Sequence, residues 1–120
     1  MMQDPRRERL RIAIVDGFAG GGEYEDEMVP GRILPGSPQI LVDAVREAEA
    51  VANVGRRKPV HVDATFHFIE KKPKTLAHLR HVLARRHDWR SEVGCVVFHD
   101  GAFEDHLEAI ITDIRSRGNE

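Results

Sequence analysis

Three short apolar runs, separated by segments with helical periodicity, constrain the fold of this chain more than any other feature. The runs cover residues 12–15, 65–69 with a lead-in from Val60, and 95–98, and they are nearly continuous in Val, Ile and Phe. Such runs are typical of parallel strands that are covered on both faces. We therefore expect an α/β fold in the order β-α-β-α-β-α, with right-handed crossovers and a Rossmann-like three-layer parallel sheet.

Start and stop signals mark the three helical segments. Ser37 followed by Pro38 predicts an N-cap and a first helical residue, and Gly55 predicts the end of that helix. Pro73 opens a second predicted helix, and a third begins near Phe103. The apolar positions that we expect to face the core are Ile40, Leu41, Ala44, Val45, Ala48 and Val51 in the first helix, Leu76, Leu79, Val82 and Leu83 in the second, and Leu107, Ile110, Ile111 and Ile114 in the third.

Length and composition indicate one globular domain over residues 1–120, with 41% hydrophobic and 32% charged residues. We divide off a basic N-terminal tail at 1–10 and an acidic Gly/Pro loop at 23–36, which is long enough for a functional lid. The single cysteine, Cys95, favours a reducing cytoplasm. No apolar run approaches the roughly 20 residues of a membrane span. The net charge is −2, so the arginines of the tail indicate a solvated strand start, and a nucleic-acid arm is the less favoured alternative.

An acidic residue stands at the end of each predicted strand. These residues are Asp16, Glu70 and Asp100. In an open parallel sheet, ligands bind beyond the carboxyl ends of the strands. A single acidic residue at a strand end is unremarkable because Asp is common in turns. An acidic residue at the end of all three predicted strands favours a ligand site.

The stretch after the first strand, "DGFAGGGEYEDE", combines a glycine turn with an acidic run. It is not the G-x-G-x-x-G fingerprint of dinucleotide-binding proteins. The charged residues that follow it are the acids Glu23, Glu25, Asp26 and Glu27, and they would repel a dianionic phosphate by several kcal/mol in a partly desolvated crevice. A ligand with a cationic centre fits better, which favours S-adenosylmethionine over NAD, FAD or ATP. The alternative is that the acidic run is a solvated loop.

Two of the strand-end acids can be given roles in binding such a ligand. Glu70 is placed to accept hydrogen bonds from both ribose hydroxyls, and Asp100 to accept one from an adenine amino group. The alternative for Asp100 is that it caps the third helix. Phe18 and Tyr24 are placed to pack on the adenosine or the methionine arm, although aromatic packing in a loop is as often structural.

These motifs resemble those of class I S-adenosylmethionine-dependent methyltransferases. "VDGFAGGGEY" resembles the first motif, "FIEKKP" the acidic motif of the second strand, and "FHDGAF" the Asp motif of the third strand. More narrowly, residues 11–116 are similar to the N-terminal part of the three-Cys-motif partner protein family, especially in "IVDGFAGGGEYED", "GSPQILVDA" and "FHFIEKKPKTLAHL". The resemblance implies a cofactor-binding role for Asp16, Phe18, Gly20, Gly22, Glu70, Asp100 and Gly101.

The resemblance also implies a further strand that pairs with the first strand. Such methyltransferases have a seven-stranded sheet in which the first strand pairs with the fourth, and the substrate-facing motif follows that fourth strand. This sequence ends after the third helix, so no catalytic residue or methyl acceptor is assigned. An unpaired first strand is an exposed edge, which proteins normally hide. We therefore expect a homodimer, or association with a further segment or partner, through this edge.

The remaining candidates are weaker. His78 and His81 share a helix face, with His87 further on, but two ligands do not make a metal site, so we expect a solvated face and no metal. His67 is expected to be a core histidine. A non-catalytic Rossmann-like interaction module is the alternative to a methyltransferase-like cofactor domain, and a nucleotide-dependent oxidoreductase is a distant third.

Overall fold

The computed structural model describes residues 8–86 and 94–118, and this part of the chain forms an α/β fold. The main sheet contains β1 (Glu8–Asp16), β4 (Val60–Glu70) and β5 (Gly94–Asp100); the helices are α1 (Ser37–Ala52), α2 (Pro73–Ala84) and α4 (Phe103–Gly118); and a small hairpin contains β2 (Glu23–Glu25) and β3 (Ile33–Pro35). None of the helices in these ranges has the length and apolar character needed to span a membrane.

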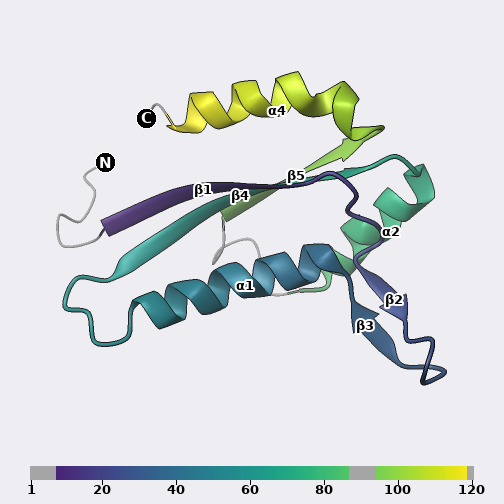
Figure 1. Ribbon diagram of the computed structural model, residues 1–120, viewed down its shortest axis with the longest axis horizontal. Helices are drawn as coiled ribbons and strands as arrows, with labels where there is room; N and C mark the ends of the chain where they lie inside the picture. The colour runs from purple at the N-terminus through teal and green to yellow at the C-terminus, as the bar shows by residue number, and fades with distance from the viewer. Residues whose placement is uncertain (1–7, 87–93, 119–120) are drawn as a thin grey trace.

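The main sheet is parallel and has the order β1-β4-β5, with the longest strand in the centre (Figure 1). Glu8 pairs with Val60 at one end of the β1–β4 ladder, and Asp16 pairs with Phe68 at the other. On the opposite side of β4, the ladder with β5 ends at Glu70 and Asp100. The predicted α/β class and parallel pairing are confirmed, and every strand-to-strand connection in this sheet passes through a helix.

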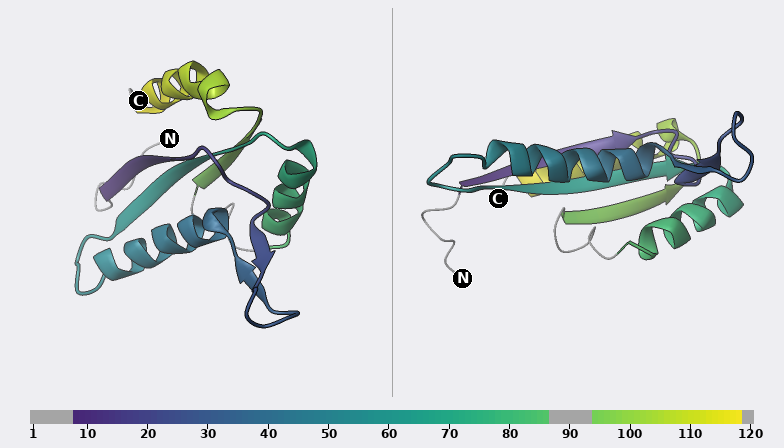
Figure 2. Two further views of the ribbon diagram at one scale, coloured as in Figure 1. Left: turned by 45° about the vertical axis from the view of Figure 1, so that its right-hand side comes forward. Right: turned by 90° about the horizontal axis from the view of Figure 1, so that it is seen from below.

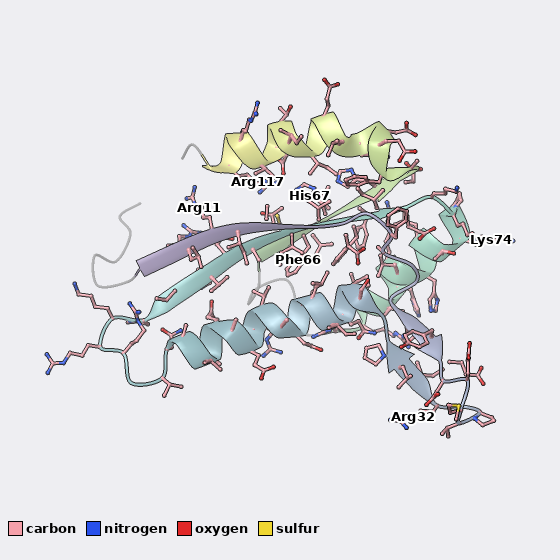
Figure 3. All side chains as sticks on the ribbon, viewed as in Figure 1. Arg11, Arg32, Phe66, His67, Lys74 and Arg117 are labelled. Atoms are coloured by element: carbon pink, nitrogen blue, oxygen red, sulfur yellow. The ribbon has the colours of Figure 1, made fainter. Side chains whose placement is uncertain are left out.

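The helices cover both faces of the sheet. Figure 1 shows α4 above the sheet and α1 below it, with α2 on the same side as α1. Successive side chains of a strand point to opposite faces, so β4 sends Phe66 toward α1 and His67 toward α4 (Figure 3). The main core lies on the α1 side and is formed by buried residues of the turn after β1, of α1, of β4 and of α2, namely Ala19, Val42, Val45, Val62, Ala64, Phe66, Phe68, Leu76, Leu79 and Leu83. The predicted inner face of α2 is confirmed, since Leu76, Leu79, Val82 and Leu83 are all buried. The predicted inner face of α1 is wrong in part, because Val42 is buried beside Val45 whereas Ile40 and Val51 are exposed.

The face under α4 is less well covered than the sequence predicts. Of the four apolar positions expected to be buried in α4, Ile110 is buried, whereas Leu107 and Ile111 remain 40% and 39% exposed. Val15, on the same face of β1, is 38% exposed. One helix cannot cover a three-stranded face alone, so the expectation that all three strands are covered on both sides is wrong for β1.

Two boundaries also differ from those expected. The N-cap of α1 is Gly36 and not Ser37, because the Ser37 hydroxyl donates to the Asp16 carboxylate instead of to the helix backbone. The predicted basic tail at 1–10 ends earlier, since β1 already begins at Glu8. His87 and the residues of the tail before Glu8 lie outside the described residues.

The stretch at 23–36 is a hairpin and not an irregular loop. Tyr24 pairs with Leu34, and the Asp26 N–H donates to the Arg32 carbonyl at 2.8 Å to close the turn. Figure 2 shows this hairpin projecting away from the main sheet beyond the start of α1. Strands of three residues are too short to leave a periodic signal in the sequence.

Candidate functional site

The three strand-end acids meet at one edge of the sheet. Asp16, Glu70 and Asp100 are each the last residue of their strand. Glu70 and Asp100 are direct partners in the parallel register, and Asp16 lies beside Phe68 on the opposite side of β4. The sheet topology therefore gathers all three predicted residues at its carboxyl edge.

The turn after β1 is bonded to the end of β4. The Ala19 N–H donates to the Ile69 carbonyl at 3.0 Å, and the Gly20 N–H donates to Glu70 Oε1 at 3.1 Å. The Phe18 N–H donates to Asp16 Oδ1 at 3.2 Å. Three consecutive backbone donors of the turn are thus satisfied by protein oxygens, two of which belong to carboxylates.

Two glycines shape this turn for different reasons. Gly22 has φ +87° and is packed so closely that an added Cβ would lie 2.9 Å from Leu79 Cδ1. Its carbonyl accepts from the Gly36 N–H at 2.8 Å and from Gln39 Nε2 at 2.7 Å, which fixes the turn against the start of α1. Gly20 has φ +72°, but no atom lies within 4 Å of an added Cβ, so this part of the turn faces open space.

Asp16 is held at the N-terminus of α1. Its second carboxylate oxygen accepts from the Ser37 hydroxyl. The partial positive charge of a helix N-terminus stabilises a carboxylate at such a position. Sequence reasoning assigned Ser37 to capping, and no sequence signal distinguished that role from bonding to Asp16.

Asp100 and Gly101 lie where β5 turns toward α4. The Gly101 N–H donates to the Glu70 carbonyl at 3.1 Å, and His106 Nε2 donates to the Asp100 carbonyl at 2.5 Å. The Asp100 side chain is exposed, and no backbone N–H in the described part of α4 donates to it. The carboxylate therefore does not cap α4 and remains open at the edge.

Phe18 is the most exposed aromatic side chain near this edge, with 86% of its surface open to solvent. It follows Asp16 by two positions in the glycine turn, so an exposed ring that is free to stack comes directly after the end of β1. Tyr24, the other aromatic candidate, belongs to β2 in the hairpin.

Three of the four acids that the sequence places around a ligand at the glycine turn bind other groups instead. Glu23 faces α2, where its Oε1 lies 3.2 Å from His78 Nε2 and 3.3 Å from an Arg85 guanidinium nitrogen. Glu25 and Asp26 accept from the Gly31 and Met28 N–H groups within the hairpin. These three carboxylates are bonded locally, so the negative charge at the glycine turn comes mainly from Asp16 and Glu70.

Within the described ranges, no group of three or more His, Cys, Asp or Glu side chains is arranged to hold a metal ion. His78 is partly exposed and pairs with Glu23, as expected for a solvated helix face. No family model, curated protein or solved structure matches this chain.

Proposed function

We propose that this chain binds S-adenosylmethionine at the carboxyl edge of its sheet, as the cofactor-binding half of a class I methyltransferase-like domain of the three-Cys-motif partner type. The N-terminal motifs that resemble this family contain all three strand-end acids and the glycine turn. The strand order and the helices on both faces are compatible with the first half of such a fold. A cytoplasmic location is proposed with it.

One observation carries the proposal. The N–H groups of Phe18, Ala19 and Gly20 donate to protein oxygens and are not directed together at a shared anion. Phosphate-binding turns work in the opposite way, because their free N–H groups converge on the phosphate. Carboxylates beside such a turn favour a ligand that carries positive charge, and the sulfonium and ammonium of S-adenosylmethionine provide it.

The proposed contacts follow from the remaining bonding capacity of each group. Both Glu70 oxygens already accept one backbone N–H each, from Gly20 and Lys72, and a carboxylate has about four lone-pair sites in total. Glu70 therefore keeps capacity for the two ribose hydroxyls. Asp100 accepts from the adenine amino group, and Phe18 closes over the adenosyl group.

The chemistry of such a site is transfer of the sulfonium methyl group to a nucleophile. The role of the described residues is to bind and orient the cofactor, and positioning alone can supply a large part of the rate acceleration. The acceptor and any catalytic base are not assigned to residues of this chain.

Calorimetric titration with S-adenosylmethionine and S-adenosylhomocysteine tests the proposal. We expect saturable binding that weakens by at least about tenfold, equivalent to 1.4 kcal/mol, in Asp16→Asn and in Glu70→Gln. The exposed hairpin variant Glu27→Gln makes the same charge change and should leave the affinity unchanged. A folded sample that releases or absorbs no heat with either compound contradicts the proposal.

A second candidate is a non-catalytic interaction module that assembles with itself or with a partner. It is favoured by the partly uncovered face formed by Val15, Leu107 and Ile111 and by the β1 edge, which pairs with no other strand in the described ranges. The two candidates are separated by Asp16→Asn and Glu70→Gln, which should weaken cofactor binding by at least about tenfold in the first case and leave self-association unchanged in the second.

A further inference from the structure

A pocket of about 320 Å³ lies between the sheet and α4, on the face opposite the main core. Its polar lining comes from three elements, with Arg9 and Arg11 from β1, Asp63, Thr65 and His67 from β4, and Arg117 from α4. Figure 3 shows Arg11, His67 and Arg117 on this side of the sheet, while Phe66 points to the other side. None of these residues belongs to the proposed cofactor site.

The pocket contains more positive than negative charge. Arg9 pairs with Asp63 at 2.7 Å, and Arg117 donates through Nε to Asp113 at 2.8 Å. Arg11 donates to the carbonyl of Arg117 at 2.9 Å, but it has no carboxylate partner in the part of the chain that the structure describes. One guanidinium charge therefore remains uncompensated at the pocket.

The pocket also contains a buried nitrogen without a hydrogen bond. His67 is 1% exposed, and its Nε2 has no hydrogen-bond partner among the described residues. Asp113 Oδ2 lies 3.2 Å away and attracts the ring, but the contact is too poorly aligned to count as a full hydrogen bond. A buried ring N–H with only this acceptor keeps donor capacity for a ligand in the pocket.

The stacked rings of His67 and His99, called the histidine stack below, show whether His67 Nε2 carries a proton. His67 Nδ1 lies 3.0 Å from His99 Nε2, so one of the two must donate to the other. If His67 Nδ1 donated, the Nε2 lone pair of the neutral ring would face the Asp113 carboxylate, which is unfavourable. We therefore assign the donor to His99, which leaves His67 with Nε2–H; this proton lies near Asp113 and can be shared with an oxyanion in the pocket.

We propose that this pocket binds the phosphate group of a small molecule. Arg11, His67 and Arg117 approach from three different elements, and a tetrahedral oxyanion can accept from donors arranged in this way, whereas the planar carboxylate group matches them less well. Arg11 supplies the charge that the protein leaves unbalanced, and the Thr65 hydroxyl adds a further donor. The two carboxylates, Asp63 and Asp113, are each engaged by their own arginine, which limits their repulsion of the ligand.

Titration of the ¹⁵N-labelled chain with inorganic phosphate, at constant ionic strength, tests this proposal by NMR. We expect saturable shifts at the amides of Arg11, Ala13, Thr65 and His67, with smaller shifts for the same concentration of acetate. Arg11→Gln should weaken binding by about tenfold. Arg32→Gln removes the same charge from the hairpin and should leave the affinity unchanged.

Several outcomes overturn the proposal. These are shifts that do not saturate, shifts scattered over the surface, and equal losses in Arg11→Gln and Arg32→Gln. If Arg11→Gln does not fold, Arg11→Lys provides the test, because it keeps the positive charge and loses the forked pair of N–H donors. Unchanged phosphate affinity in Arg11→Lys contradicts the role of Arg11. Failure of S-adenosylmethionine binding has no bearing on this titration, because the two sites share no residue.

Discussion

The backbone N–H of Gly20 donates to Glu70 Oε1 at 3.1 Å, although the two residues are 50 positions apart in the sequence. The other oxygen of Glu70 accepts from the Lys72 N–H at 2.8 Å. One side chain thus connects the turn after β1, the end of β4 and the segment that leads into α2. The same carboxylate is proposed to bind the ribose. Glu70 therefore contributes both to holding the turn in place and to the proposed ligand binding.

Replacing Glu70 should reduce stability in a graded way. Glu70→Ala leaves the Gly20 and Lys72 N–H groups without their acceptor, and we expect a loss of about 1–3 kcal/mol in the free energy of unfolding. Glu70→Gln keeps one acceptor oxygen and should lose less. Urea unfolding measures both, and Glu27→Ala serves as the exposed control. Equal stability of Glu70→Ala and the control would show that the bond between turn and strand contributes nothing.

Gly20 and Gly22, the two glycines with positive φ in the turn after β1, should respond differently to alanine. Gly20→Ala meets open space, so we expect only the cost of the left-handed backbone, about 1–2 kcal/mol. Gly22→Ala carries the same backbone cost and also forces its Cβ against Leu79 and Val82, which adds about 1–3 kcal/mol for overpacking. Thermal or urea unfolding of the two variants should therefore rank Gly22→Ala as the less stable. The reverse order would contradict the observed packing of the turn.

Stability should fall on mild acidification because of the histidine stack. Burial lowers the pKa of His67, as does the nearby Arg117 charge, whereas Asp113 raises it. Burial also lowers the pKa of His99, with further lowering by His67 and His106 against an opposing effect of Asp113. The histidines of the unfolded chain bind protons near pH 6.5, whereas His67 and His99 of the folded chain bind them only at lower pH. The free energy of unfolding should therefore decrease as the pH falls from about 6.5 toward the lowered pKa values.

Urea unfolding between about pH 7.5 and 5.5 measures this dependence. His99→Gln removes one of the titrating rings and should flatten the slope. His81→Gln, which replaces an exposed histidine of α2 away from the stack, serves as the matched control. A slope that is the same in all three proteins would mean that the stack does not control the pH dependence.

The outer edge of β1, which pairs with no further strand among the described residues, predicts self-association. Parallel strands expose unused N–H and C=O groups at an edge, and Leu10 adds an apolar side chain that is exposed there. We expect sedimentation at micromolar concentrations to detect a dimer, and Leu10→Lys to shift it toward the monomer. Val54→Lys places the same charge in the loop between α1 and β4 and should have no effect. A monomer at every concentration for the unmodified chain would contradict the prediction.

The features that could be predicted from the sequence were those with a strong local signal. The parallel strands follow from apolar runs, and the buried face of α2 follows from the spacing of Leu76, Leu79 and Leu83. The exposure of Leu107 and Ile111 could not be predicted in this way, because periodicity identifies an apolar face but does not say how much of it a neighbour covers.

The site was predictable to the extent that topology determines it. Asp16, Glu70 and Asp100 follow their strands directly, so parallel pairing is enough to bring them to one edge. The bond between Ser37 and Asp16, and the unbonded Nε2 of His67, depend on tertiary packing. The position of Arg9 and Arg11 on one face of β1 could have been predicted, because alternate residues of a strand share a face. It was missed because the strand was expected to begin after them.

Each ladder of the main sheet joins segments that are separated in the chain by at least one whole helix. No strand pair of the main sheet can therefore form from residues that are close in the sequence. Formation of this sheet must wait for two large loops to close, which is a slow process compared with helix formation. Until both neighbours arrive, the apolar centre of β4 is open to solvent. On a newly synthesised chain, that segment is the one that we expect chaperones to bind first and aggregation to begin from.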